Sequence, residues 1–394
     1  MPTSRAETQQ EPHHPTILHL DAVTSITGGG APRQVWVPGP VIVGAGPSGL
    51  ATAACLKARG VPSLVLEKDT CVASSWRHRT YERLRLHLPR SFCELPLMAF
   101  PPGTPPYPTR DQFVAYLDAY ARAFGVEPRL GVRVRSAAYD AAIGFWRVVF
   151  TVDGEGDGGA AATEFVSRWL VVATGENAEP AWPEGVEGMD GYRGVALHTS
   201  SYKKGDEFRG KNVLVVGCGN SGMEVSLDLC NNGARASMVV RDKVLYYSDI
   251  LEILGISTFG FSMFLLRWFS TKRVDSLLLF FSRLILGDTE KYGLPRPKMG
   301  PLQIKSSTGK TPVLDIGALR KIKKGEIKKE ILQVVPAINR FTENGVEFID
   351  GHREDFDAVI FATGYKSNVP SWLKVHYTYN TLNVLEYIIL KKNE

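Results

Sequence analysis

The 394-residue sequence lacks closely spaced cysteines, which excludes several chemistries at once. Its cysteines are Cys55, Cys71, Cys93, Cys218 and Cys230, and no two of them form a Cys-x-x-Cys pair. A zinc site or a redox-active dithiol is usually built from such pairs, so we expect neither, and a disulfide reductase is disfavoured. The same pattern favours a reducing compartment, and we therefore expect a cytoplasmic protein.

Strong charge and long apolar runs are also missing. The net charge is only +5, so nothing global indicates a nucleic-acid partner. No stretch reaches the roughly 18 uncharged apolar residues of a membrane-spanning helix. The most apolar stretches, 259–269 and 276–286, predict amphipathic helices that pack on the protein body. In the alternative interpretation, 259–286 forms an interfacial patch that touches a membrane surface, such as the endoplasmic reticulum, or shields an apolar substrate entry.

Two glycine-rich turns are the most informative feature present. Each lies between an apolar strand-like run, 41–43 or 213–216, and a helix-favouring segment. In such a turn the three glycines allow a tight bend, close approach to a pyrophosphate, and packing of helix on strand. We therefore predict an α/β protein with two Rossmann-like dinucleotide-binding domains. The predicted pyrophosphate-binding residues are Gly44, Ala45, Gly46, Pro47, Ser48 and Gly49 in the first turn, and Gly217, Cys218, Gly219, Asn220, Ser221 and Gly222 in the second.

The residue after each second strand distinguishes the two nucleotides. In the first unit it is Glu67, followed by Lys68, and a carboxylate suits ribose hydroxyls while repelling a 2′-phosphate. In the second unit it is Arg241, whose guanidinium can bind a 2′-phosphate with two hydrogen bonds. We therefore predict FAD at the first site and NADPH at the second. In the alternative, Arg241 is a solvated cation at a strand end.

Two near copies of one segment, 169–175 and 358–364, suggest how the domains are connected. Each reads as a buried strand that ends in Ala-Thr-Gly, and the first copy ends in Ala173, Thr174 and Gly175. We predict that the NADPH domain is inserted into the FAD domain. The predicted boundaries are a flexible N-terminal extension at 1–39, FAD domain at 40–178 and again at 321–374, NADPH domain at 179–320, and a tail at 375–394.

Several motifs resemble those of flavin-containing monooxygenases. Residues 192–202 match the fingerprint Phe-x-Gly-x-x-x-His-x-x-x-Tyr, with Tyr192 in place of the leading phenylalanine. Within that family the chain most resembles the plant YUCCA enzymes over residues 35–374. The supporting stretches, besides the first glycine turn, are 75–77, 84–89, 173–177, 311–315 and 361–365.

The resemblance implies a reaction and some of its site residues. YUCCA enzymes convert indole-3-pyruvate to indole-3-acetic acid, the plant hormone auxin, with NADPH, FAD and oxygen, through a C4a-peroxyflavin. Trp76, Arg77 and His87 fall where the family lines its flavin site, and Asn177 falls near the flavin–nicotinamide junction. In the alternative, Trp76 is core and Arg77 a surface cation. For His198 we predict a structural role, and no side chain is identified as a catalytic acid or base.

The late part of the sequence departs from the family. Residues 243–247 stand where family members usually have a His-Val-Leu-Pro-Arg-like run, and 328–333 read as a short insertion. The tail 375–394 contains no glycine and stands where family members have a glycine-rich closing segment. We therefore expect weak FAD binding and poor turnover unless the tail substitutes for that packing. Two alternative functions follow: a catalytically impaired, splice-type isoform, or another two-dinucleotide flavoenzyme such as an N-hydroxylating monooxygenase. The sequence does not indicate an oligomeric state.

Overall fold

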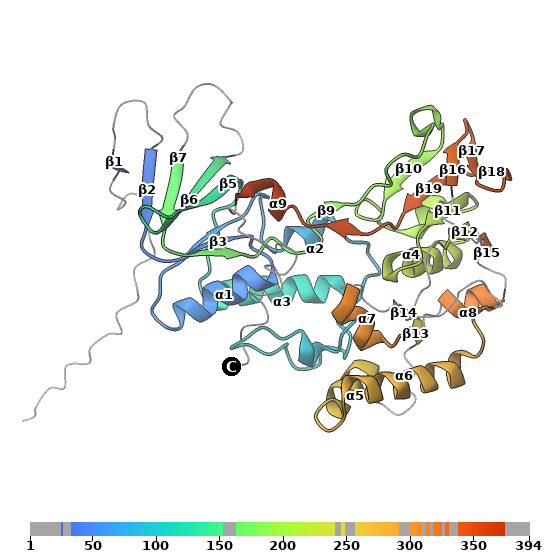
Figure 1. Cartoon of the computed structure of the whole chain (residues 1–394), viewed down its shortest axis with the longest axis horizontal. Helices are drawn as coiled ribbons and strands as arrows, with labels where there is room; N and C mark the ends of the chain where they lie inside the picture. The colour runs from blue at the N-terminus through green and yellow to red at the C-terminus, as the bar shows by residue number, and fades with distance from the viewer. Residues whose placement is uncertain are drawn as a thin grey trace, which may run out of the picture. The chain divides into compact units, whose positions relative to one another are not determined.

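The chain forms two compact units, each with its own sheets (Figure 1). The computed structural model describes residues 25–26, 33–152, 163–240, 246–248, 257–290, 299–308, 313–315, 318–324, 328–330 and 338–374. The first unit contains 25–26, 33–72, 120–152, 163–174 and 369–374, and the second contains the described residues of 73–119 and 175–368. Within these ranges no helix is both long and apolar enough to cross a membrane.

The first unit contains a three-stranded parallel sheet in the order β4-β3-β8. β3 (Val41–Val43) lies between β4 (Leu64–Leu66) and β8 (Leu170–Val172). The branched residues of β3 are fully buried, as expected for a central parallel strand. α1 (Pro47–Lys57) follows β3 directly and has proline in its first turn, where a missing N–H costs nothing. The predicted strand, turn and helix are confirmed.

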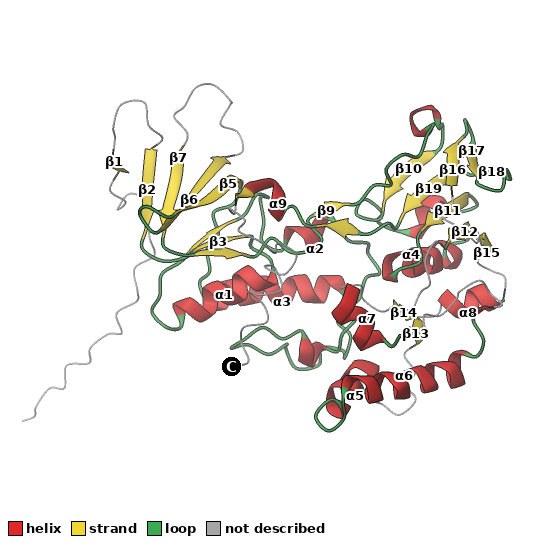
Figure 2. Cartoon of the chain, viewed as in Figure 1, coloured by secondary structure: helices red, strands yellow, loops and turns green. Residues whose placement is uncertain are grey.

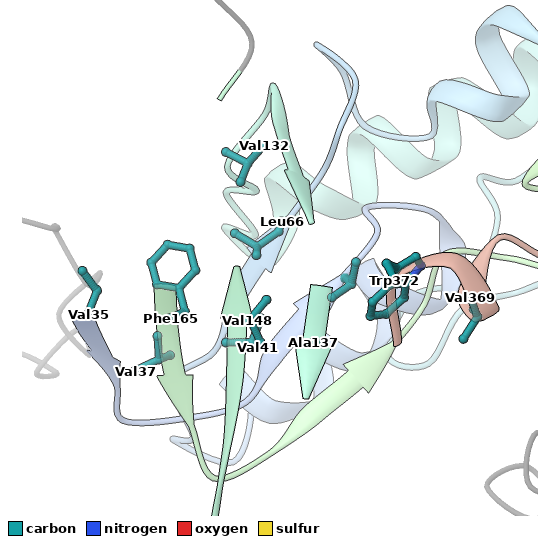
Figure 3. Close-up of a cluster of buried hydrophobic side chains, with 11 residues drawn as sticks. Val35, Val37, Val41, Leu66, Val132, Ala137, Val148, Phe165, Val369 and Trp372 are labelled. Atoms are coloured by element: carbon teal, nitrogen blue, oxygen red, sulfur yellow. The ribbon is translucent and has the colours of Figure 1, made fainter. Parts of the chain in front are cut away.

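A six-stranded sheet completes the first unit, in the order β1-β2-β7-β6-β5-β21. Its strands are β1 (Ser25–Ile26), β2 (Arg33–Val37), β5 (Val132–Asp140), β6 (Phe145–Val152), β7 (Thr163–Ser167) and β21 (Leu373–Lys374). Figure 3 shows that one hydrophobic cluster joins the two sheets, with Val41 and Leu66 beside Val148 and Phe165. Trp372 of α9 (Val369–Trp372) packs into the same cluster, so the chain returns to this unit at its last described residues.

The second unit is built on a five-stranded parallel sheet in the order β10-β19-β11-β12-β15. Its strands are β10 (Val195–His198), β11 (Asn212–Val216), β12 (Arg235–Val239), β15 (Lys328–Glu330) and β19 (Ala358–Phe361). α4 (Asn220–Asn231) follows β11, which confirms the second predicted strand, turn and helix. Both units thus have the predicted α/β class.

Figure 2 distinguishes the remaining helices and strands, most of which belong to the second unit. The helices are α2 (Ser74–His78), α3 (Arg110–Ala123), which runs into the first unit, α5 (Thr258–Leu265), α6 (Thr271–Leu286), α7 (Pro301–Thr308) and α8 (Ala318–Lys323). The strands are β9 (Glu179–Pro180) paired with β20 (Tyr365–Lys366), β13 (Tyr246–Ser248) paired with β14 (Val313–Asp315), and a sheet of β16 (Ile338–Phe341), β17 (Gly345–Phe348) and β18 (Arg353–Asp355). α5 and α6 confirm that helices form in 259–269 and 276–286, but only α6 is clearly amphipathic, because α5 is apolar nearly all round.

Three predicted boundaries need correction. β19 pairs with β10 and β11, so the second Ala-Thr-Gly strand belongs to the second sheet and the chain returns to the first unit at 369, not at 321. Residues 73–119 belong to the second unit, because their side chains contact α4. Residues 33–37 are not part of a flexible extension, since β2 pairs with β7. Arg241 and the tail at 375–394 lie outside the described residues.

Candidate functional site

The two glycine-rich turns have nearly the same geometry, although they lie in different units. Gly44 has a φ of +109° and Gly217 a φ of +112°, a backbone conformation that favours glycine. A Cβ atom on Gly44 would lie 2.4 Å from the carbonyl oxygen of Ala173, and one on Gly217 would lie 2.5 Å from that of Ala362. Each Ala-Thr-Gly segment therefore packs against its own glycine turn, which explains why the sequence contains two copies.

The third glycine of each turn is required for packing. A Cβ on Gly49 would lie 1.9 Å from the carbonyl oxygen of Gly44, and one on Gly222 would lie 2.0 Å from that of Gly217. No side chain can be added at those distances without moving the backbone. The first and third glycines therefore hold each helix against its turn.

The second glycine of each turn has a different environment. A Cβ on Gly46 or Gly219 would have no atom of the chain within 4 Å, and neither residue has a positive φ. Both are the N-cap residues of their helices, and glycine has no side chain with which to cap α1 or α4. An open space at an uncapped helix N-terminus fits an anionic group that approaches the backbone closely, such as a pyrophosphate.

Two polar groups support the first turn. The carboxylate of Glu67, which is buried, accepts hydrogen bonds from the N–H of Ala45 at 2.8 Å and from the N–H of Asp69 at 3.1 Å. Glu67 thereby holds the turn, and each of its oxygens keeps a lone pair for a ribose hydroxyl.

The hydroxyl oxygen of Thr174, in the Ala-Thr-Gly segment, is buried and has no hydrogen-bond partner among the described residues. Such a buried hydroxyl is expected to gain a partner when a nucleotide binds.

Trp76 and Arg77 lie on α2 and have protein partners of their own. The ring of Trp76 packs edge-on against Phe113, with 4.7 Å between ring centroids. The guanidinium of Arg77 forms an ion pair with the carboxylate of Asp118 on α3. These contacts hold α2 on α3, and Trp76 is half-buried there. A role of either residue at the flavin stays a prediction.

His87 lies beside the helix of the second glycine turn. Its Nε2 atom is 2.7 Å from a carboxylate oxygen of Glu224, and the other oxygen of Glu224 accepts a hydrogen bond from the hydroxyl of Tyr81 at 2.6 Å. Glu224 is buried in α4. Burial and the adjacent carboxylate raise the pKa of Tyr81 well above its usual value, so its hydroxyl stays protonated and donates. The structure thus places His87 in the second unit, and its predicted contact with flavin stays untested.

Sequence reasoning overlooked the buried carboxylates of α4. Glu224 and Asp228 lie four residues apart, on one face of the helix. Asp228 accepts hydrogen bonds from the hydroxyl of Tyr202 and from the N–H of Gly205, at 2.7 and 2.8 Å. Two acidic residues at this spacing, each flanked by apolar residues, were the signal in the sequence, because buried carboxylates need donors from neighbouring segments.

The fingerprint of residues 192–202 performs structural roles. The hydroxyl of Tyr192 donates a hydrogen bond to the carbonyl oxygen of Phe356 at 2.7 Å. A Cβ on Gly194 would lie 2.8 Å from the carbonyl oxygen of Asp357, so this position must be small. The hydroxyl of Tyr202, the last residue of the fingerprint, donates a hydrogen bond to the carboxylate of Asp228. The fingerprint therefore fastens β10 to the chain that precedes β19 and to α4.

His198 completes the fingerprint and is fully buried. Its Nδ1 atom accepts a hydrogen bond from the N–H of Ser200 at 3.1 Å, so the proton is on Nε2, which donates to the carbonyl oxygen of Gly364 at 3.0 Å. Gly364 ends the second Ala-Thr-Gly segment and has a φ of +86°. The predicted structural role therefore agrees with the geometry, because His198 holds the turn that follows β19.

We expect the stability of the protein to depend on the charge of His198. Burial lowers its pKa below the usual value of 6.5, so the neutral ring stabilises the fold above that pH and the contribution is lost as the pH falls through the lowered pKa. His198→Gln should cost about 1–3 kcal/mol at pH 7, because buried hydrogen bonds are lost. Thermal unfolding from pH 7 to pH 5 should therefore show a smaller loss of Tm in the variant. An equal loss in both proteins would contradict this role.

The remaining predicted residues are placed as follows. Asn177 is exposed and lies two residues after Gly175, whose φ is +81°. Cys218 is buried in a hydrophobic cluster of the second unit. Asn220 and Ser221 form the first turn of α4, and Pro47 and Ser48 form the first turn of α1. Lys68 is half-buried after β4.

Comparison with protein families and curated sequences gives consistent matches. Residues 41–250, which include both glycine turns, match the family described as pyridine nucleotide-disulphide oxidoreductase. The rice protein indole-3-pyruvate monooxygenase YUCCA1 is 58% identical over 342 residues, covering 87% of this chain and 80% of the relative. The Arabidopsis thaliana protein indole-3-pyruvate monooxygenase YUCCA6 is 57% identical over 347 residues, covering 87% and 80%.

Solved structures share the fold at low sequence identity. A flavin-containing monooxygenase from Stenotrophomonas maltophilia superposes with a TM-score of 0.59 and 21% identity, covering 85% of this chain and 80% of that one. The crystal structure of the OTEMO complex with FAD and NADP gives a TM-score of 0.66 at 18% identity, covering 91% and 77%. That structure holds two dinucleotides on the fold that this chain adopts.

Proposed function

The chain belongs to the YUCCA family of flavin-containing monooxygenases, and on that basis we propose that it converts indole-3-pyruvate to indole-3-acetic acid with NADPH and oxygen. The observation that carries the proposal is the pair of open, uncapped helix N-termini at Gly46 and Gly219, which provides two separate dinucleotide sites in one chain. The cofactors are FAD and NADPH. FAD held at the first turn would supply the hydride-accepting and oxygen-activating chemistry.

The chain's own residues bind and orient the two nucleotides. At the first turn, the amides at the start of α1 would bind the FAD pyrophosphate, and Glu67, which holds the turn through Ala45, would bind ribose hydroxyls. At the second turn, the amides at the start of α4 would bind the NADPH pyrophosphate. Because the cofactor carries the oxygen chemistry, the proposal assigns no side chain as acid or base.

The direct test is turnover by the purified full-length chain. Released flavin is measured against protein, and NADPH oxidation is then followed with indole-3-pyruvate, with indole-3-acetic acid quantified as the product. The proposal expects bound FAD, product formation that depends on indole-3-pyruvate, and a product equivalent for each NADPH consumed in the coupled reaction. Folded protein that binds FAD but forms no indole-3-acetic acid would refute the assigned substrate, and an N-hydroxylated amine as product would identify the alternative flavoenzyme class.

The impaired-isoform alternative has a separate readout. If the protein folds but contains no flavin and stays inactive with added FAD, the chain is a catalytically impaired form. A protein with stoichiometric FAD that turns over rules this alternative out. The same preparation therefore decides between the two candidate functions.

Arg241 is proposed to select NADPH over NADH. It lies outside the described residues, so its role rests on its position after β12. Arg241→Ala should raise the KM for NADPH by about thirtyfold, because a charge-assisted hydrogen-bonded contact to the 2′-phosphate is worth about 2 kcal/mol. The KM for NADH should change little. Steady-state kinetics with both nucleotides measures the difference, and equal increases for both would contradict the assignment.

We propose a cytoplasmic location. No disulfide joins any of the five cysteines, which is typical of proteins from a reducing compartment. A fluorescent fusion fractionated into cytosol, lumen and membranes tests this location. A signal confined to the lumen would contradict it.

A further inference from the structure

The most exposed apolar side chains of the protein gather on one helical hairpin of the second unit. Among the large hydrophobic residues, only five have more than half of their surface exposed, within the part of the chain that the structure describes. Four of these lie on α5, α6 and the turn between them: Trp268 at 75%, Leu284 at 68%, Phe280 and Phe264. A monomeric protein seldom exposes so many large apolar groups together unless they contact something.

We propose that this hairpin is a docking surface for the headgroup region of a lipid bilayer that carries anionic lipids. The surface, called here the aromatic surface, consists of Phe259, Phe264, Trp268, Phe269, Phe280 and Leu284. Aromatic side chains of this kind are favoured at the boundary between lipid headgroups and acyl chains. The proposal concerns an interaction that the monooxygenase activity does not require, so either can fail without the other.

The opposite face of α6 is already used for packing. Val274 and Leu278 are buried against Leu302 and Ile304 of α7. The carboxylate of Asp275 accepts hydrogen bonds from the N–H groups at the start of α7, at 3.0 Å each. α6 therefore packs on α7 through the face that carries Val274 and Leu278. The side chains of Phe280 and Leu284 lie on a different face of the helix and are exposed.

The charge beside Phe264, Trp268 and Phe269 is positive, whereas at the far end of α6 the exposed Arg283 is accompanied by the exposed Asp288 and Glu290. Residues 257–274 contain no acidic residue, whereas Arg267, Lys272 and Arg273 are exposed within them. Asp275, which follows, is buried against α7 and does not offset this charge at the surface. Cations next to exposed aromatic rings complement an anionic lipid surface. They oppose face-to-face pairing of two copies, since that would bring like charges together.

A loop of the same unit contacts the aromatic surface through Phe92. The ring of Phe92 packs edge-on against Phe259, with 4.9 Å between centroids. Further along this loop, the hydroxyl of Tyr116 accepts a hydrogen bond from the N–H of Leu95 and donates one to the carbonyl oxygen of Met98, at 2.7 Å each. Between them Leu97 is 60% exposed at a φ of +72°. This strained conformation is rare for leucine and presents an apolar side chain to solvent.

Co-sedimentation of the full chain with phosphatidylcholine vesicles, with and without phosphatidylserine, tests the proposal. We expect binding at least about tenfold tighter to the anionic vesicles, weakened by salt. Phe264→Ser/Trp268→Ser should reduce binding to both vesicle types by about tenfold, because it removes apolar contact. Arg267→Gln/Lys272→Gln/Arg273→Gln should remove the preference for anionic vesicles and leave the weaker binding to phosphatidylcholine.

The control variant is Ile143→Ser, which removes an exposed apolar side chain from the turn between β5 and β6. It should bind vesicles as the unmodified chain does, and all variants should keep their FAD content and turnover. Absence of binding to either vesicle type overturns the proposal. The proposal is also overturned if the protein self-associates without lipid in a concentration-dependent way and Phe264→Ser/Trp268→Ser abolishes that association. The aromatic surface would then be an interface between copies of the chain. A raised KM for indole-3-pyruvate with no change in lipid binding would instead assign the surface to substrate entry.

Discussion

Replacing Gly46 by alanine is expected to lower the FAD content of the purified protein by at least about tenfold, because the added methyl group occupies the space through which the pyrophosphate reaches the backbone. The fold should persist, since a Cβ at this position meets no atom of the chain within 4 Å and the residue has no positive φ. Visible absorbance of the flavin against protein concentration, together with thermal unfolding, measures both effects. Turnover should fall with flavin content.

Gly49→Ala and Gly191→Ala are the comparisons that make this result specific. A Cβ on Gly49 would lie 1.9 Å from the carbonyl oxygen of Gly44, so that variant should lose flavin and stability together. Gly191 also has open space around it but lies outside both turns, so Gly191→Ala should keep its flavin. A Gly46→Ala protein with full flavin content would place the FAD pyrophosphate somewhere other than the first turn.

Gly219→Ala should have the complementary effect on the second nucleotide. The residue has the same N-cap position and the same open space as Gly46, but it lies at the start of α4. We expect the KM for NADPH to rise by at least about tenfold while FAD content stays near that of the unmodified chain. The rate of flavin reduction at subsaturating NADPH, measured by stopped-flow absorbance, reports the change directly.

The two variants are matched controls for each other, because each adds one methyl group at an equivalent position of a different turn. Gly46→Ala should affect flavin content, and Gly219→Ala should affect use of NADPH. NADH should also bind more weakly to Gly219→Ala, since the pyrophosphate is common to both nucleotides. Reversed effects would exchange the two nucleotide assignments, and a loss of FAD in both variants would indicate that the turns do not act independently.

The nucleotide-binding elements could be predicted from the sequence because their causes are local. A strand, a glycine turn and a helix follow one another within about 20 residues at both sites, and each glycine has a steric reason that any chain would share. The motif resemblance likewise indicated the family and both cofactors. The two apolar stretches 259–269 and 276–286 predicted two helices, and the second repeats its apolar residues with the helical period.

What the sequence by itself determined, then, is the pair of dinucleotide motifs and the family. The tertiary structure decided which unit each later segment joins. β19 resembles β8 in sequence, yet it pairs with β11, because Ala362 packs on Gly217 as Ala173 packs on Gly44. His87 joins α4 because a buried carboxylate there needs donors. Both outcomes depend on contacts between residues more than 100 positions apart, and local pattern carries no information about such partners.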